Sequence, residues 1–431
     1  MPVTGSYSDY KDSGNFSTSV STRSPVIRIH GRNEFPRPTM GLAAATTSES
    51  PGRIDFDIHG VVRIRLIDPS PGELRAAYKL LGRPSRLPVV NPDITVRFAE
   101  DLSASQIRFL GNNQGFTDDG FYLLQEGTRR VKARIPFDQI GERCEIVCKG
   151  GVESVPLLMP IIGLTAIKRG HIPLHASAAV HDNVGLLMAG WAHCGKTTAL
   201  LGFASKGAEY VGEEWVLLSD NGQTMCGLMR PLELSHSQVD GLPHLWRSVQ
   251  PVRRWAFHGI GVLRALQQMV RGEKSRSSFV FRGFQKVSAS LEGRLRPAIT
   301  PSAIFRDRIC CAGASVDKIF LFLSHEGRRI EAEPITSFEM ACRLTFLVQH
   351  ELTPLLQHYV AYRFAFPNLK NEFIENIAEY LPAILTRALH NKETYIVRVP
   401  YPHVFEELYE AIRPLCKPKT AAIAESAHAL A

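Results

Sequence analysis

The sequence predicts an α/β protein, and three features carry that expectation. An apolar, strand-like run leads into a glycine-containing turn and a helix-forming stretch at residues 184–206. Short alternating runs of polar and apolar residues fill positions 53–150, and helical patterns dominate after position 326. Alternation with a period of two is typical of half-buried strands, whereas apolar residues three or four apart indicate helices. We therefore expect an α/β core between a β-rich N-terminal domain and a mostly helical C-terminal part.

Length and composition limit the class of protein. With 431 residues the chain has room for two or three domains, and 44% hydrophobic and 21% charged residues are typical of a soluble globular protein. The formal net charge of +8 suits an anionic ligand but is too diffuse to indicate nucleic acid by itself. We see no signal peptide and no membrane-spanning run, and the eight cysteines form no C-x-x-C pair. These features favour a cytoplasmic protein with reduced thiols that does not bind a membrane.

Changes in composition along the chain predict its domain organisation. Residues 1–50 are rich in Ser, Thr, Gly, Pro and Asn, which is typical of a disordered tail. The other predicted parts are a β-rich N-terminal domain at 51–150 with a helix at 72–81, an α/β core at 151–325 with a basic insertion at 241–300, a mostly helical part at 326–415, and a tail at 416–431.

The elements follow in order from the local patterns. Alternating runs predict short strands throughout the N-terminal domain, and glycine or proline marks several element ends. In the core we expect a helix at 155–169, strands at 171–180, 184–190 and 209–219, and a helix at 196–206. In the rear part we expect helices at 337–349, 351–362, 371–389 and 401–411, with a strand at 393–400.

The turn at residues 190–195 carries the most specific motif. Gly190, Gly195, Lys196 and Thr197 meet the phosphate-loop pattern of glycine, four residues, glycine, lysine, and serine or threonine. N–H groups at a helix start favour an anion, and glycine lets the backbone wrap closely around it. In such loops the lysine reaches the β- and γ-phosphates and the hydroxyl holds Mg²⁺. The alternative is a plain strand-to-helix turn with an exposed lysine.

The whole loop is expected to contact the nucleotide. Its residues are Gly190, Trp191, Ala192, His193, Cys194, Gly195, Lys196, Thr197 and Thr198. Cys194 has two interpretations. Near a helix N-terminus its thiolate could be favoured, which would make it sensitive to oxidation. A small side chain that fills the loop is the favoured interpretation.

Two adjacent acids, Glu213 and Glu214, interrupt the apolar strand predicted at 209–219. Neighbouring side chains of a strand face opposite sides, so at least one carboxylate should face the phosphate loop. This would be an acid of the Walker-B kind with a second carboxylate beside it. The basic insertion at 241–300, with interleaved aromatic residues, has three interpretations: a mobile lid or channel for an acidic substrate, a nucleic-acid surface, or a solvated helical face.

Residues 174–219 resemble the core of the HPr kinase/phosphorylase family and its HPr-kinase-like relatives. That family places a histidine before the phosphate loop and an acidic pair after it. Here His175 precedes Lys196 by 21 residues and Glu213 follows it by 17, as in the family. The resemblance implies an HPr kinase/PEP carboxykinase-like nucleotide-binding core. It also implies an ATP- and Mg²⁺-dependent kinase that phosphorylates a hydroxyl, such as serine, on a protein, peptide or small molecule.

The resemblance also implies roles for individual residues. Lys196 would bind the phosphates, Thr197 and Glu214 would serve the metal, Glu213 would act as catalytic base, and His175 would lie beside the active site. The chain departs from the family pattern with Ala192-His193 in place of Ser-Gly and with Glu213-Glu214 in place of Asp-Asp. These departures leave open a second function, a regulator or scaffold that binds nucleotide without transferring phosphate. The identity of the acceptor and assembly into a homo-oligomer are open as well.

Overall fold

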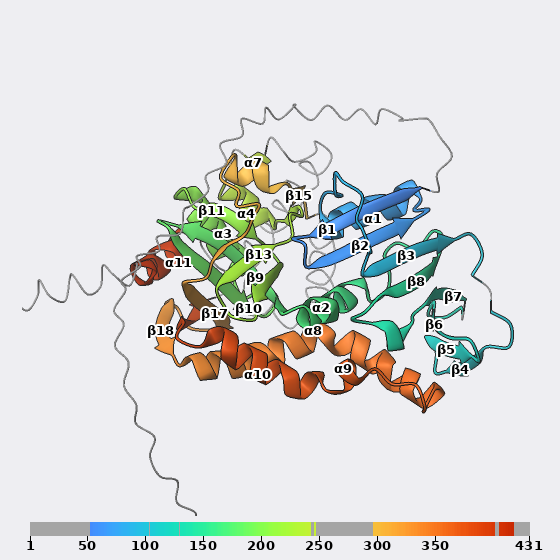
Figure 1. Ribbon diagram of the computed structural model, residues 1–431. Helices are drawn as coiled ribbons and strands as arrows, with labels where there is room; N and C mark the ends of the chain where they lie inside the picture. The colour runs from blue at the N-terminus through green and yellow to red at the C-terminus, as the bar shows by residue number, and fades with distance from the viewer. Residues whose placement is uncertain are drawn as a thin grey trace, which may run out of the picture. The chain divides into compact units, whose positions relative to one another are not determined.

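The chain is a mixed α/β protein with two large mixed β-sheets and a helical stretch in its C-terminal part (Figure 1). The computed structural model describes residues 52–102, 104–128, 130–242, 245–246, 296–400 and 405–417. All of them belong to one unit that begins at Ser50. The predicted tail at 1–50, nearly all of the basic insertion at 241–300 and most of the tail at 416–431 lie outside the described residues. The predicted domain boundaries remain predictions.

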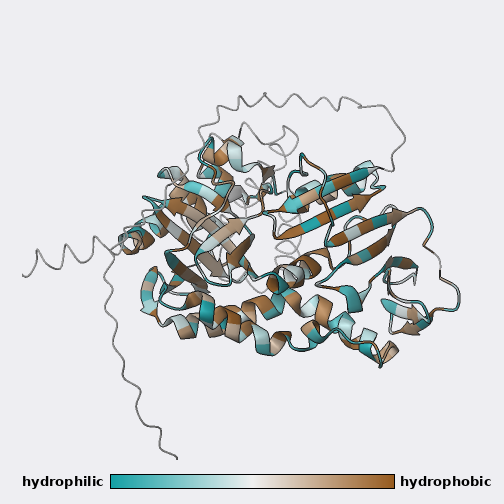
Figure 2. Cartoon of the chain, viewed as in Figure 1, coloured by the Kyte–Doolittle hydropathy of each residue, from teal (hydrophilic) through white to brown (hydrophobic). Residues whose placement is uncertain are grey.

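The first sheet contains eight strands in the order β1-β2-β3-β8-β7-β6-β5-β4 among the described residues. Strands β2, β3 and β8 pair in parallel and the other pairs are antiparallel. Buried and more exposed residues alternate along β2, and Figure 2 shows hydrophobic and hydrophilic residues alternating on the strands of this sheet. The strands are β1 (Arg53–Ile58), β2 (Val62–Ile67), β3 (Ile94–Ala99), β4 (Arg108–Leu110), β5 (Gln114–Thr117), β6 (Gly120–Leu124), β7 (Val131–Arg134) and β8 (Cys144–Lys149).

The second sheet has the order β16-β13-β12-β9-β10-β17-β19-β18, and β11 also pairs with β9. Strands β10, β17 and β19 are parallel, whereas β9 runs antiparallel to β10 and β12. Strands β14 (Leu232–Glu233) and β15 (Ala298–Ile299) form a separate pair. The strands of the large sheet are β9 (His171–His181), β10 (Val184–Gly190), β11 (Glu209–Gly212), β12 (Trp215–Ser219), β13 (Thr224–Gly227), β16 (Ala314–Ser315), β17 (Lys318–His325), β18 (Glu331–Ile335) and β19 (Glu393–Pro400).

Helices cover both faces of the second sheet, which explains why β10 is apolar throughout. Leu187 and Ala189 belong to the core on the side of α2, α8 and α10, whereas Leu186 and Met188 belong to the core on the side of α3 and α11. A strand buried on both faces needs no polar alternation. The helices are α1 (Pro71–Leu81), α2 (Leu158–Lys168), α3 (Lys196–Ser205), α4 (His236–Asp240), α7 (Pro301–Phe305), α8 (Ser337–Ala365), α9 (Glu372–Glu375), α10 (Ile377–Leu389) and α11 (Phe405–Ile412), and 3₁₀ turns lie at Phe137–Gln139 and Arg413–Cys416.

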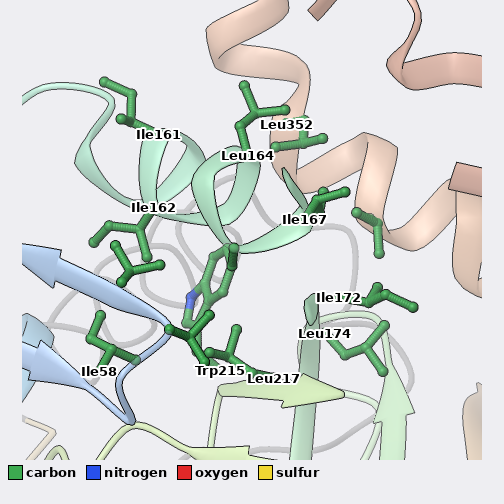
Figure 3. Packing of buried hydrophobic residues seen from close by; sticks show 14 of the residues in the cluster. Ile58, Ile161, Ile162, Leu164, Ile167, Ile172, Leu174, Trp215, Leu217 and Leu352 are labelled. Carbon is green, nitrogen blue, oxygen red and sulfur yellow. The ribbon is translucent and has the colours of Figure 1, made fainter. Parts of the chain in front are cut away.

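The two sheets share one apolar core. Figure 3 shows Trp215 of β12 beside α2, with Ile58 of β1 and Leu217 of β12 close by. Helix α8 connects both sheets, because Glu351 bonds to β9 while Tyr362 packs on Phe121 of the first sheet. No helix of the described residues is long and apolar enough to cross a membrane.

Three predictions of elements differ from the structure. The helix expected at 371–389 is divided at Asn376 into α9 and α10. The helices expected at 337–349 and 351–362 form one 29-residue helix, α8, with Pro354 inside it. Its buried stripe continues through the expected break at Val348, Leu352 and Leu355, so tertiary packing outweighs the proline. The strand expected at 209–219 is divided into β11 and β12, because the backbone turns at Glu213 and Glu214.

Candidate nucleotide-binding site

The phosphate loop lies where β10 ends at Gly190 and α3 begins at Lys196. Gly190 has φ +151°, and a Cβ there would lie 2.6 Å from the carbonyl oxygen of Phe322 in the neighbouring strand β17. Real Cβ atoms do not approach that closely, so the packing of the loop against β17 requires glycine. Gly195, with φ +103°, precedes the helix in the left-handed region. The backbone conformation of the loop therefore explains why both motif positions are glycine.

Lys196 is folded into the loop. Its Nζ donates to the carbonyl oxygens of Gly190 and Trp191, both at 2.7 Å, and only 5% of the residue is exposed. Burial lowers the pKa of Lys196, and the nearby Cys194 and Glu213 partly oppose that shift. The exposed lysine of a plain turn is thus not what the structure shows. To bind a phosphate, the ammonium group of Lys196 would have to exchange its hydrogen bonds to these two carbonyl oxygens for hydrogen bonds to phosphate oxygens.

The non-glycine residues of the loop have distinct environments. His193 has φ +62°, in the left-handed region that few non-glycine residues occupy and that histidine tolerates better than most. Burial, Arg296 and Lys196 lower the pKa of His193, which favours a neutral ring over a phosphate-binding cation. Cys194 is buried and burial raises the pKa of its thiol despite the nearby Lys196, in keeping with a filler role. Ala192 is exposed.

The two threonines at the start of α3 bond to different partners. Thr197 Oγ1 donates to Oε1 of Glu213 at 2.7 Å. Thr198 Oγ1 instead accepts from Nε2 of Gln238 at 3.1 Å, so it braces the loop against α4. Glu213 is 8% exposed, and burial raises the pKa of its carboxyl group, with the Thr197 hydroxyl opposing the shift. The expected contact between the loop and one of the two acids is therefore present, and the acid is Glu213.

Glu214 turns the other way. It has φ +67°, and its carboxylate forms an ion pair with Nη2 of Arg230 at 2.8 Å. Arg230 is buried, with 7% of its surface exposed, and its Nε has no hydrogen-bond partner among the described residues. This arginine compensates the charge of the second acid. Its place in the turn between β13 and β14 gave no sequence signal.

His175 lies beside the acid pair because of strand pairing. Its strand β9 aligns His175 with Trp215 of β12, and the N–H of Ala176 donates to the carbonyl of Glu214. Nδ1 of His175 lies 2.9 Å from Oε1 of Glu351 in α8. The hydrogen bond to His175 lowers the pKa of Glu351, which keeps this acid ionised. A histidine with one ring nitrogen held by a carboxylate has a fixed orientation.

One aromatic pair borders the loop. The Trp191 ring lies 4.3 Å from the His350 ring, measured between centroids, and 48% of Trp191 is exposed. The structure thus brings together the predicted loop, Glu213 and His175, and adds His350 and Glu351 from α8. Neither α8 residue gave a sequence signal, because the surrounding pattern resembles that of an ordinary core helix.

A scan against protein-family models and a search of curated proteins both find no match to this chain.

Proposed function

We propose that the chain binds ATP with Mg²⁺ and transfers a phosphoryl group to a hydroxyl acceptor, such as the serine of a protein, a peptide or a small molecule. The observation that carries the proposal is the 2.7 Å contact between Thr197 Oγ1 and Glu213 Oε1 at the carboxyl end of β10. It places an acid from a separate strand connection beside the hydroxyl of the phosphate loop, and phosphoryl transfer uses an acid near the phosphates to hold Mg²⁺ or to orient the acceptor hydroxyl. An HPr kinase/PEP carboxykinase-like core is the finer fold that we propose with this function.

The donor set fits a phosphate-bound magnesium ion. Mg²⁺ usually takes one or two protein oxygens and completes its shell with phosphate and water. The Thr197 hydroxyl supplies one such oxygen, and no group of three metal-ligating side chains lies among the described residues. Glu214 can serve the metal only if its ion pair with Arg230 opens. When bound, the ion would neutralise phosphate charge.

The other groups suit the acceptor side of the reaction. Glu213 is buried with a raised pKa, which makes it a stronger base than an exposed carboxylate. We propose that Glu213 accepts the proton of the acceptor hydroxyl during transfer. His175, held by Glu351, would position the acceptor or the transferred group next to the acid pair. Lys196 would leave its two loop carbonyls and bind the phosphates.

Thermal unfolding with and without Mg·ATP tests the binding half of the proposal. Ligand at 100 times its Kd stabilises the native state by about 2.7 kcal/mol, so the wild type should show a clear rise in Tm. Lys196→Ala should lose this rise. Lys206→Ala changes an exposed lysine at the other end of the same helix and should retain it. Equal shifts in both variants would refute the site.

Transfer is tested separately with γ-labelled ATP and hydroxyl acceptors. Glu213→Gln should abolish transfer and largely spare the affinity for nucleotide. The second candidate function, a nucleotide-binding regulator, is favoured by one observation: Lys196 and Glu214 both have partners within the chain. ATP binding without transfer to any acceptor would select the regulator.

A further inference from the structure

A cavity lies away from the phosphate loop, between the first sheet and the segment that follows β13. Its volume is about 280 Å³. Most of its wall is apolar and comes from β2, α1, β3 and the start of α2. The main apolar lining residues are Leu66, Ala77, Leu80, Phe98, Val155 and Leu158. Small-molecule sites are usually concave and mostly apolar, with a few polar groups.

The size of the cavity limits its occupant. A cavity of roughly 150 Å³ lined by aliphatic and aromatic residues holds one benzene molecule. The present volume therefore suits an apolar molecule of about ten to twelve non-hydrogen atoms.

Charges around the cavity limit the occupant further. Three acids, Glu73, Glu153 and Glu233, line it together with two cations, Lys79 and Arg230. Lys79 and Glu233 form an ion pair at 2.6 Å, and Arg230 is paired with Glu214 outside the lining. A carboxylate ligand would meet a wall whose cations are already neutralised. The acids of the wall would repel a carboxylate, whereas a neutral or cationic head group would not be repelled.

The cavity wall is connected to the candidate nucleotide site through residues 227–233. The ring of His59 contacts the carbonyl of Gly227 at 2.9 Å. The backbone at Gly82, which ends α1, is so close to Met229 that a Cβ there would lie 2.4 Å from its carbonyl oxygen. Arg230 lies in the same segment, next to Met229 and before Glu233, and it forms the ion pair with Glu214. These contacts connect α1 to the segment that carries Arg230, the partner of Glu214.

We propose that this cavity binds a small apolar molecule with a neutral or cationic head, and that occupancy is coupled through Arg230 to Glu214. The binding half is independent of the proposed kinase function. The regulatory half depends on that function only in its consequence, because the coupling itself is measured without nucleotide.

Three probes of matched length test the binding: octylamine, octanol and octanoate. Isothermal titration and saturation-transfer NMR on the full chain should detect octylamine and octanol, with octanoate at least about tenfold weaker, a difference of about 1.4 kcal/mol. Ala76→Leu, which fills the cavity from a half-buried position in α1, should abolish binding. Val152→Phe fills it from a loop and serves if the first variant fails to fold. Ala378→Leu, an exposed alanine of α10, should bind normally.

No binding by any probe, equal binding by the filled variants, or tighter binding of octanoate would overturn the assignment. The coupling is tested with Glu214→Gln, which weakens the pair with Arg230 and should change the Kd of octylamine about fivefold or more. Glu339→Gln, in an exposed ion pair of α8, is the matched control. An unchanged Kd in Glu214→Gln would refute the coupling. If the chain bound octylamine but not Mg·ATP, the proposed function would fail and the cavity assignment would stand.

Discussion

The contact between Thr197 and Glu213 makes a quantitative prediction that needs no ligand. Thr197→Val removes the hydroxyl at nearly constant volume and leaves a buried carboxylate without its donor. A hydrogen bond to a charged group contributes about 1.5–3 kcal/mol, and a neutral one about 0.5–1.5 kcal/mol. We expect the variant to lose more unfolding free energy at pH 8 than at pH 4, with a loss of about 1.5–3 kcal/mol where Glu213 is ionised.

The pH dependence has a definite sign. The Thr197 hydroxyl lowers the pKa of Glu213 relative to the same buried carboxyl without it. Its extra stabilisation is therefore present above the pKa of Glu213 and is lost as the pH falls through it. Near pH 4 the loss in Thr197→Val should approach the value for a neutral hydrogen bond.

The neighbouring threonine supplies the control. Thr198 bonds to the neutral amide of Gln238, so Thr198→Val should cost about the same at pH 8 and pH 4. The measurement is urea unfolding of the wild type and both variants at the two pH values, without Mg²⁺ or nucleotide. The reasoning is refuted if Thr197→Val destabilises the protein equally at both pH values, or not at all.

Three further predictions concern the same site. Gly190→Ala should lower the unfolding free energy by about 1–3 kcal/mol, because the new Cβ would lie 2.6 Å from a carbonyl oxygen. Gly72→Ala is the control, since its Cβ would have no neighbour nearer than 3.8 Å and should not lower the stability. Comparing the Tm of the two variants with that of the wild type tests this prediction. Glu213→Gln should raise Tm at pH 8 and change it little at pH 4, since burial raises the pKa of Glu213 and so penalises its charged form only at high pH; a lower Tm at pH 8 would contradict this. Glu351→Gln should reduce phosphoryl transfer at least about tenfold and shift its pH profile while the Kd for Mg·ATP stays within twofold of the wild type, because a neutral amide replaces the carboxylate that orients the ring of His175.

Local sequence patterns predicted the elements that depend on local chemistry. The helix α1 begins after Ser70 with the reciprocal hydrogen bonds of a capping box to Glu73, a signal that lies within four residues. The strand β10 and the start of α3 follow from an apolar run and the motif glycines in the same way. Such elements need no information from elsewhere in the chain.

The rest of the site depends on contacts distant in sequence. The partner of His175 lies 176 residues away, in a helix whose pattern shows only a buried stripe. The turn at Glu213 and Glu214 was missed because Glu214 adopts a left-handed conformation that glutamate rarely occupies. Its ion pair with Arg230 compensates the acid, and that arginine belongs to a segment with no motif. Tertiary pairing, rather than propensity, fixes these positions.

Helix α8 limits which length changes the gene can accept. Glu351 and Tyr362 are eleven residues apart on one uninterrupted helix, which separates them by about 16 Å along its axis. One inserted residue between them would rotate one end by about 100° relative to the other. Either Glu351 would leave His175 or Tyr362 would leave Phe121 and Phe137. Insertions and deletions should therefore be absent from 351–362, while turns such as 326–329 can vary in length.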